Sequence, residues 1–363
     1  MLLFIRDAGQ YTIGSNTITI LDDSTYILPN SNYASSQNIQ GAPSSPTFSF
    51  GGSNRGHTYR YSKSYGGKID FTSQVNNKHA LKMGLQYRID NLNERLFSVL
   101  YDDNTYRIPT IGPENASPSH SYYSENAIFF SSYIQDKLEY ESFIMNVGIR
   151  YDLFDPQSSH VDSLLNPENS LIKSSKKTMW SPRIGVAYPI TDEGILHFSY
   201  GHFYQMPTLR NLFLKNIFGA GLSPTIGYSD LKPQKTVMYE FGMQQQLSRF
   251  LAINGSIFYK DIRDLLALQT INYNSPTYGP SSYSIYLNKD YSMVKGVTLS
   301  LTKRRDPNTK MSAFLDYSYQ TTEGNSVSSG SFYFNALTGQ EEEKKIVPLS
   351  WDQSHVFLSL IHI

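Results

Sequence analysis

The sequence contains no cysteine and only two tryptophans among its 363 residues. Without cysteine, the chain has neither a disulfide scaffold nor a thiolate metal site. Lysine plus arginine number 31, and aspartate plus glutamate also number 31, so the basic excess typical of nucleic-acid-binding proteins is missing. No apolar run approaches the roughly 20 residues that a transmembrane helix needs. These absences argue against a disulfide-rich domain, a nucleic-acid partner and a helical membrane protein.

Sequence patterns for catalysis and for cofactors are absent as well. No glycine-rich phosphate loop follows a strand-like segment. The eight histidines show no paired metal-ligand spacing on one face. No set of serine, histidine and aspartate suggests a catalytic triad. We therefore expect that the chain is not an enzyme and that it holds neither a metal nor a cofactor.

The sequence is rich in aromatic residues, and its apolar residues alternate with polar ones. It has 28 tyrosines and 20 phenylalanines. Apolar side chains occupy most second positions in residues 81–90, 143–152, 237–244, 251–260 and 311–320. A period of two indicates β-strands with one apolar face. The mean hydropathy of −0.38 agrees with this, because the strands of a transmembrane barrel average out as polar.

The connections between these segments alternate in length. Short polar turns occur near 76–78, 139–142, 191–194, 247–249 and 304–308. Long segments rich in serine, asparagine, glycine and proline occupy 100–124, 154–178, 205–235, 269–283 and 321–350. Bacterial outer-membrane barrels show this rhythm, with tight periplasmic turns and long extracellular loops. We count about ten strands in five hairpins, with one more strand near 351–360 and another near 11–21.

Four tyrosines occupy equivalent places in the alternating segments. Tyr87, Tyr151, Tyr259 and Tyr317 each lie about eight or nine residues past a short turn, on the apolar face. At ~3.3 Å per residue and a tilt near 40°, this spacing is a height of roughly 20–24 Å. The apolar band of a transmembrane barrel is about 25 Å tall and is flanked by aromatic girdles. We therefore predict an all-β, antiparallel transmembrane β-barrel whose outer girdle includes these tyrosines. The alternative is a soluble β-protein with tyrosines at its strand ends.

Several short motifs carry a family resemblance. The motifs are Ser181–Tyr188, His202–Leu209, Leu231–Thr236 followed by Tyr239–Gly242, Val294–Leu299 and Pro348–His355. In order and spacing they resemble the barrel of TonB-dependent receptors, especially the Bacteroidota-type group with a carboxypeptidase-regulatory-like N-terminal domain. The sequence departs from the family pattern at Thr298, where the family has glutamate, and at Ser354, where it has arginine.

The resemblance implies that residues 1–357 are part of a larger barrel. We expect a fragment of about 10–12 strands from a barrel of roughly 22. The family's plug domain and TonB-contact segment would then lie outside this chain. The apolar run Leu2–Ile5 is too short for a signal peptide, so we expect the true start to lie upstream. At the other end, we expect residues 358–363 to be the translation of a sequencing adapter.

The resemblance also implies a function. The expected protein is a receptor of the Gram-negative outer membrane that takes up a nutrient, such as a siderophore or a glycan, by coupling to TonB. Its partners would be outer-membrane lipid, the extracellular nutrient and the TonB complex acting through the plug. A passive porin or adhesin-like barrel and a soluble β-sandwich array are the alternatives.

Ligand contacts are expected among the tyrosines of the loops and the rim, because aromatic rings stack on sugars and on rigid ligands. The candidates are Tyr101, Tyr106, Tyr122, Tyr123, Tyr204, Tyr228, Tyr273 and Tyr278.

Overall fold

The computed structural model describes most of the chain. The described residues are 9–13, 16–20, 25–27, 56–102, 105–108, 120–167, 170–214, 225–276, 279–305, 310–325 and 346–362. The chain forms two compact units. Unit 1 comprises Met1–Ser62, Leu92–Ser124 and Lys215–Pro224, and unit 2 comprises Lys63–Asn91, Glu125–Leu214 and Thr225–Ile363. Among the described residues, no helix is long and apolar enough to span a membrane.

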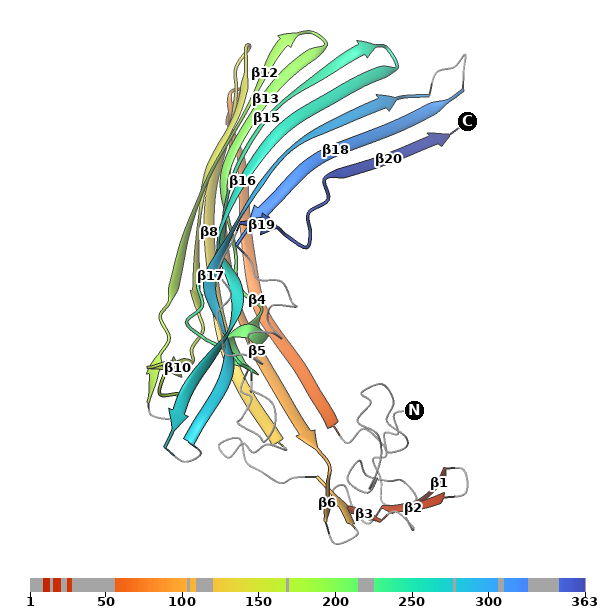
Figure 1. Ribbon diagram of the computed structural model, residues 1–363. Helices are drawn as coiled ribbons and strands as arrows, with labels where there is room; N and C mark the ends of the chain where they lie inside the picture. Colours follow the sequence, from red (N-terminus) through yellow and green to blue (C-terminus); the bar gives the residue numbers. More distant parts are fainter. Residues whose placement is uncertain are drawn as a thin grey trace. The chain divides into compact units, whose positions relative to one another are not determined.

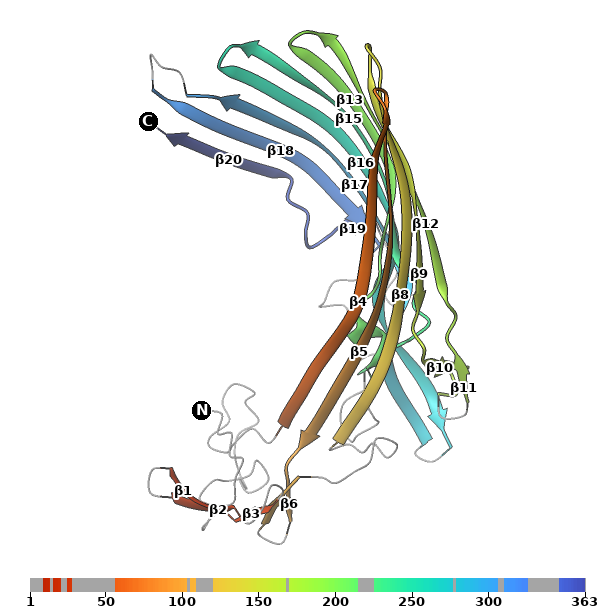
Figure 2. The same ribbon diagram turned by 180° about the vertical axis from the view of Figure 1, so that it is seen from behind.

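Long strands lie side by side in one largely antiparallel sheet, and most of its residues belong to unit 2 (Figures 1 and 2). The sheet contains β4 (Gly56–Asn76), β5 (His79–Ser98), β8 (His120–Glu139), β9 (Ile144–Asp155), β12 (Lys177–Thr191), β13 (Gly194–Gln205), β14 (Thr225–Ile226), β15 (Gln234–Ser248), β16 (Leu251–Ser275), β17 (Gly279–Lys303), β18 (Ser312–Gly324), β19 (Val347–Pro348) and β20 (His355–His362).

The long strands follow one another across the sheet in the order in which they occur along the chain. The order is β19-β18-β17-β16-β15-β13-β12-β9-β8-β5-β4, and β20 pairs with the same strand, β18, as β19 does. The sheet does not close on itself, because β4 lies at one end of this order and β19 and β20 lie at the other. This arrangement confirms the predicted all-β, antiparallel fold of a partial barrel, and it shows the up-and-down strand order.

The short turns predicted near 76–78, 139–142, 191–194 and 247–249 are confirmed, and most of the turn predicted at 304–308 lies outside the described residues. Local hydrogen bonds fix two of these turns. In the turn between β4 and β5, Asn76 Oδ1 accepts hydrogen bonds from the backbone N–H groups of Lys78 at 2.8 Å and His79 at 3.0 Å. Between β12 and β13, Thr191 Oγ1 accepts a hydrogen bond from Glu193 N at 3.2 Å. Side chains of this kind reproduce the hydrogen bond of a backbone turn, so they favour tight reversals.

The prediction of a long loop over 269–283 was wrong. Strands β16 and β17 continue as a hairpin, paired from Leu266↔Asn288 out to Ser275↔Gly279. In Figure 1 this hairpin is drawn in cyan and blue tones, and it continues beyond the residues at which β16 pairs with β15 and β17 pairs with β18. The segment alternates after all, since Ile271, Tyr273 and Tyr283 supply the aromatic and β-branched side chains that favour strands. The serines and asparagines between them are typical of loops, which is why the composition of this segment predicted one.

Other connections also contain secondary structure. Within 154–178, β10 (Ser159–Val161) pairs with β11 (Leu171–Lys173). Within 205–235, helix α1 (Leu209–Phe213) buries Leu212 and Phe213. The segment after it returns as β14, which pairs in parallel with β17 at Ser284 and Ile285.

Unit 1 contains a separate five-stranded sheet. Its strands are β1 (Gly9–Ile13), β2 (Asn16–Ile20), β3 (Thr25–Ile27), β6 (Leu100–Asp102) and β7 (Thr105–Arg107), in the order β1-β2-β3-β7-β6. The single barrel strand predicted near 11–21 is therefore a hairpin of two short strands, and it belongs to this second sheet.

The main sheet exposes large apolar side chains on one face. Leu85 and Ile257 are 54% and 55% exposed, although both lie within long strands. Aromatic rings also lie close to one another between neighbouring strands. The ring centre of Tyr151 on β9 lies 4.8 Å from that of Trp180 on β12, and the ring centre of Tyr239 on β15 lies 6.4 Å from that of Tyr259 on β16. Such a face is costly in water and is stable against hydrocarbon. Placement of these rings at a membrane girdle stays a prediction.

The end of the chain continues the same sheet. β20 pairs with β18 from His355↔Tyr319 to His362↔Ser312, so residues 358–362 lie in this strand. The adapter origin of residues 358–363 is not tested by this pairing and stays a prediction.

Candidate functional site

The polar face of the main sheet contains a hollow of about 190 Å³. Strands β5, β8, β9 and β12 and the end of β13 contribute its lining. We call it the arginine hollow, and its lining residues are Gln86, Arg88, Phe129, Phe130, Ser131, Arg150, Asp152, Leu153, Met179, Ser181, Arg183, Tyr204 and Met206.

Strand register brings the polar side chains of the hollow together. Asp152 of β9 lies opposite Ser131 of β8 and opposite Met179 of β12. Two positions back along β9, Arg150 lies opposite Ser181 of β12. Directly opposed residues of an antiparallel pair project from the same face of the sheet. The period of two along each strand therefore places these side chains on one wall, facing away from the exposed apolar face.

Two arginines of the hollow are held by aspartates on their own strands. Arg150 Nε lies 2.9 Å from Asp152 Oδ2, and Arg150 Nη2 lies 2.8 Å from Asp152 Oδ1, which is a two-pronged pair. Arg88 Nη2 lies 3.1 Å from an oxygen of Asp90, and its guanidinium lies 4.3 Å from the centre of the Phe129 ring. These contacts fix the two guanidinium groups, because fork-like pairing and ring stacking both restrict orientation.

Arg183 is held differently. Its guanidinium lies 4.5 Å from the centre of the Phe203 ring. Among the residues that the structure describes, no carboxylate lies within ion-pair distance of it. Gly201 lies opposite Arg183 on β13, and a Cβ at this glycine would lie 3.1 Å from the Phe203 ring and 3.3 Å from Arg183 Cγ. Glycine at this position therefore leaves room for the stacked pair.

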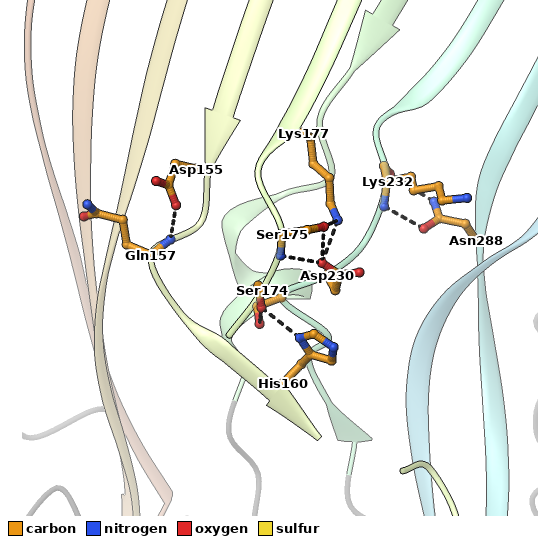
Figure 3. Close-up of polar contacts among 10 residues, drawn as sticks. Asp155, Gln157, His160, Ser174, Ser175, Lys177, Asp230, Lys232 and Asn288 are labelled. Atoms are coloured by element: carbon orange, nitrogen blue, oxygen red, sulfur yellow. Dashed lines mark hydrogen bonds and ion pairs between the residues drawn. The ribbon is translucent and has the colours of Figure 1, made fainter. Parts of the chain in front are cut away.

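A second cluster of polar residues links the long connections at the ends of the strands (Figure 3). We call it the loop cluster, and it consists of His160, Ser174, Ser175, Lys177, Ser229, Asp230, Lys232 and Asn288. At its centre, Asp230 Oδ1 accepts hydrogen bonds from Lys177 Nζ at 2.6 Å, from Ser175 Oγ at 2.7 Å and from Ser175 N at 2.8 Å. Burial alone would raise the pKa of the Asp230 carboxyl, but these donors outweigh it and hold the pKa below its usual range.

Further contacts extend the loop cluster to both sides. The hydroxyl groups of Ser174 and Ser229 lie 2.5 Å apart, and His160 Nδ1 lies 3.0 Å from Ser174 Oγ. On the other side, Asn288 Oδ1 accepts a hydrogen bond from Lys232 N at 2.8 Å, and Asn288 Nδ2 donates to Lys232 O at 3.0 Å. The cluster thus joins the connection before β12, the connection before β15 and the hairpin of β16 and β17.

The structure separates the eight candidate tyrosines. Tyr204 lines the arginine hollow. Tyr228 borders the loop cluster, with its ring centre 4.8 Å from that of His160. Tyr273 is a core residue, 8% exposed, and packs against Tyr283 at 5.6 Å. Tyr123 is also buried, at 2% exposed.

The remaining candidate tyrosines give no further site in the described residues. Tyr101 of β6 and Tyr106 of β7 are partners in the backbone register of unit 1. Tyr122 is half-buried on β8. Tyr278 lies outside the described residues. Ligand contact by any of the eight stays a prediction.

Sequence reasoning did not single out Arg88, Arg150 and Arg183. Alternation places the first two on the polar face, and the third lies in the Ser-Pro-Arg motif. Their convergence depends on the register between separate strands, which the order of residues in one strand does not contain.

A family model described as "TonB dependent receptor-like, beta-barrel" matches residues 5–342. The chain belongs to this family. The match covers nearly the whole chain and agrees with the open antiparallel sheet, so the soluble β-sandwich alternative is set aside. The narrower resemblance to the Bacteroidota-type group stays a prediction.

Solved structures of outer-membrane transporters share the fold. The outer-membrane transporter YddB from Escherichia coli is 15% identical, with a TM-score of 0.60 over 84% of this chain and 40% of that one. The copper transporter OprC is 13% identical, with a TM-score of 0.54 over 86% of this chain and 43% of that one. At these identities the likeness shows the fold alone. The chain thus spans about two fifths of the length of these two structures. No curated protein matches the sequence.

Proposed function

We propose that this TonB-dependent receptor barrel forms part of the wall of an outer-membrane importer, through which a nutrient is taken up by coupling to TonB. The family match and the partial barrel support this assignment. The ligand would enter from the extracellular side, where long connections such as 154–178 and 205–235 lie. The plug and the TonB complex would act from the other side. The chain supplies binding and passage, and no residue is assigned a catalytic role.

The observation that carries the proposal is the arginine hollow on the polar face of the sheet. Arg88 lies nine residues past His79, where β5 begins, and Arg183 lies eight residues before Thr191, where β12 ends. At ~3.3 Å per residue, both arginines lie near the predicted outer girdle rather than at the short turns. A ligand that arrives from outside would therefore meet the hollow as it enters the barrel.

Nutrient uptake tests the proposal. The gene would be deleted from its host and restored from a plasmid at the length that the genomic reading frame encodes. Growth on limiting nutrient sources would then be compared in hosts with and without TonB. We expect at least one source to need both the receptor and TonB. Receptor-dependent growth that persists without TonB would contradict the proposal and favour a passive porin.

A further inference from the structure

We propose that the arginine hollow binds the anionic group of the imported ligand, a carboxylate or phosphate carried on a small organic molecule, between Arg150 and Arg183. This inference rests on the proposed function, because it specifies the chemistry of the ligand that enters the barrel. Three arginines and one aspartate line the hollow, so its wall carries an excess of positive charge.

Arg183 has donors available for such a group. Its guanidinium uses its face to stack on the Phe203 ring. The N–H groups of a guanidinium lie in its plane, so stacking holds the group in position and leaves its edge open to an acceptor. Among the described residues, no carboxylate occupies that edge. A planar oxyanion matches this fork better than a neutral hydroxyl does.

Arg150 presents a second, oriented guanidinium. Its pairing with Asp152 uses Nε and Nη2, so Nη1 projects on the other side of the group. The two arginines share one hollow, and like charges in a partly buried site repel. An anion between them would remove that repulsion and gain a charge-assisted hydrogen bond from each. Asp152 forms an ion pair with only one of the two, Arg150.

The rest of the lining indicates an organic carrier for the anion. Met179, which is 4% exposed, lines the hollow, and Phe129 and Met206 complete its apolar part. Aromatic and thioether groups favour contact with apolar or ring-shaped ligand atoms. Sites for drug-sized ligands measure about 300–1,000 Å³, so a hollow of about 190 Å³ fits the anionic end of a ligand.

Isothermal titration calorimetry on the receptor in detergent micelles tests the inference. The receptor would be purified at the length that its reading frame encodes. The probes are benzoate, its uncharged analogue benzamide, citrate and inorganic phosphate. We expect at least one of the anions to bind, and we expect benzoate to bind more tightly than benzamide. In Arg183→Gln the anion affinity should fall about ten- to hundred-fold, the loss of one charge-assisted interaction. Arg183→Lys should recover part of it.

Arg249→Gln is the matched control, because Arg249 lies in the short turn between β15 and β16 and contributes nothing to the hollow. It should bind the anions as the unaltered receptor does. The heat-dependent gel mobility of each variant would confirm that its barrel is folded. Failure of the unaltered receptor to bind any anion, or equal affinity in folded Arg183→Gln, would overturn the inference.

One further result would also overturn the inference. If Arg183→Gln lowers the melting temperature of the receptor but not its anion affinity, the arginine serves another part of the receptor, such as the plug. Calorimetry does not depend on TonB, so this result is separate from the growth experiment. If Arg183→Gln binds the anions with unchanged affinity and still supports normal TonB-dependent growth, the proposed function stays intact and only this inference is removed.

Discussion

Lys177 and Asp230 stand 53 residues apart in the sequence, yet Lys177 Nζ lies 2.6 Å from Asp230 Oδ1 (Figure 3). The lysine side chain is 10% exposed and the aspartate side chain 28%. The contact joins the first residue of β12 to the segment that leads into β15. It therefore holds two long connections together above the sheet.

Replacing Lys177 with methionine should loosen these connections. Removal of one partner leaves the Asp230 carboxylate partly buried, which costs about 1–3 kcal/mol. Hydrogen–deuterium exchange should then become faster in 170–176 and 227–233 and stay unchanged in β12. Lys176→Met is the control, because its ammonium lies 3.3 Å from Asp155 on a side chain that is 62% exposed. If 170–176 and 227–233 exchange at the same rate in both variants, the pair of Lys177 and Asp230 does not hold these connections together.

The Asp230 carboxyl also predicts a pH dependence for the loop cluster. Its pKa in the folded state lies below the ordinary value of about 3.9. A carboxyl of this kind stabilises the folded form above its unfolded pKa, and this stability is lost as pH falls through the folded pKa. A spin label at the exposed Ser170 should thus keep constant mobility from pH 7 to about 4 and become more mobile below it. In Asp230→Asn, the mobility should already be raised at pH 7 and show no such step.

Much of the fold could be predicted from the sequence, because in this chain the local rules determine it. Alternation in 81–90 distinguishes the apolar from the polar face, and Asn76 indicates a tight turn. The local rules failed for the hairpin of β16 and β17, where Tyr273 and Tyr283 lie among serine and asparagine. There, packing between the two strands outweighs the turn-forming tendency of their polar residues.

The candidate site could be predicted only in part. Tyr204 was a candidate and does line the hollow. Arg150 and Arg183 became candidates only once β9 and β12 were in register, because the sequence does not state which residues of two strands face each other. Contact between Lys177 and Asp230 likewise depends on where two long connections cross, and composition carries no information on that.

Gly227 should not tolerate a side chain. A Cβ there would lie 2.6 Å from Leu214 N and 2.8 Å from Leu212 O, both backbone atoms that cannot move aside easily. Gly227 N also donates a hydrogen bond of 2.7 Å to Leu214 O, so the close approach is part of the fold. Gly227→Ala should cost about 1–3 kcal/mol and speed hydrogen exchange in α1.

Gly67 supplies the control for this variant. A Cβ at Gly67 would meet no atom within 4 Å, so Gly67→Ala should leave exchange in α1 unchanged. The prediction fails if the amides of α1 exchange as slowly in Gly227→Ala as they do in Gly67→Ala.

Tyr204 and Tyr273 were both candidate ligand contacts, but their replacement should have different effects. Loss of the Tyr204 ring should weaken binding, and loss of the Tyr273 ring should lower stability. Tyr204 lines the hollow, so Tyr204→Ala should weaken benzoate binding about two- to ten-fold, the contribution of one stacked ring, without altering folding. Tyr273 is buried against Tyr283, so Tyr273→Ala should cost about 3 kcal/mol locally and speed exchange along β16 and β17. Tyr65→Ala, at a ring that is 66% exposed on β4, should change neither quantity. If Tyr273→Ala weakened benzoate binding more than Tyr204→Ala did, the ligand would contact the projecting hairpin rather than the arginine hollow.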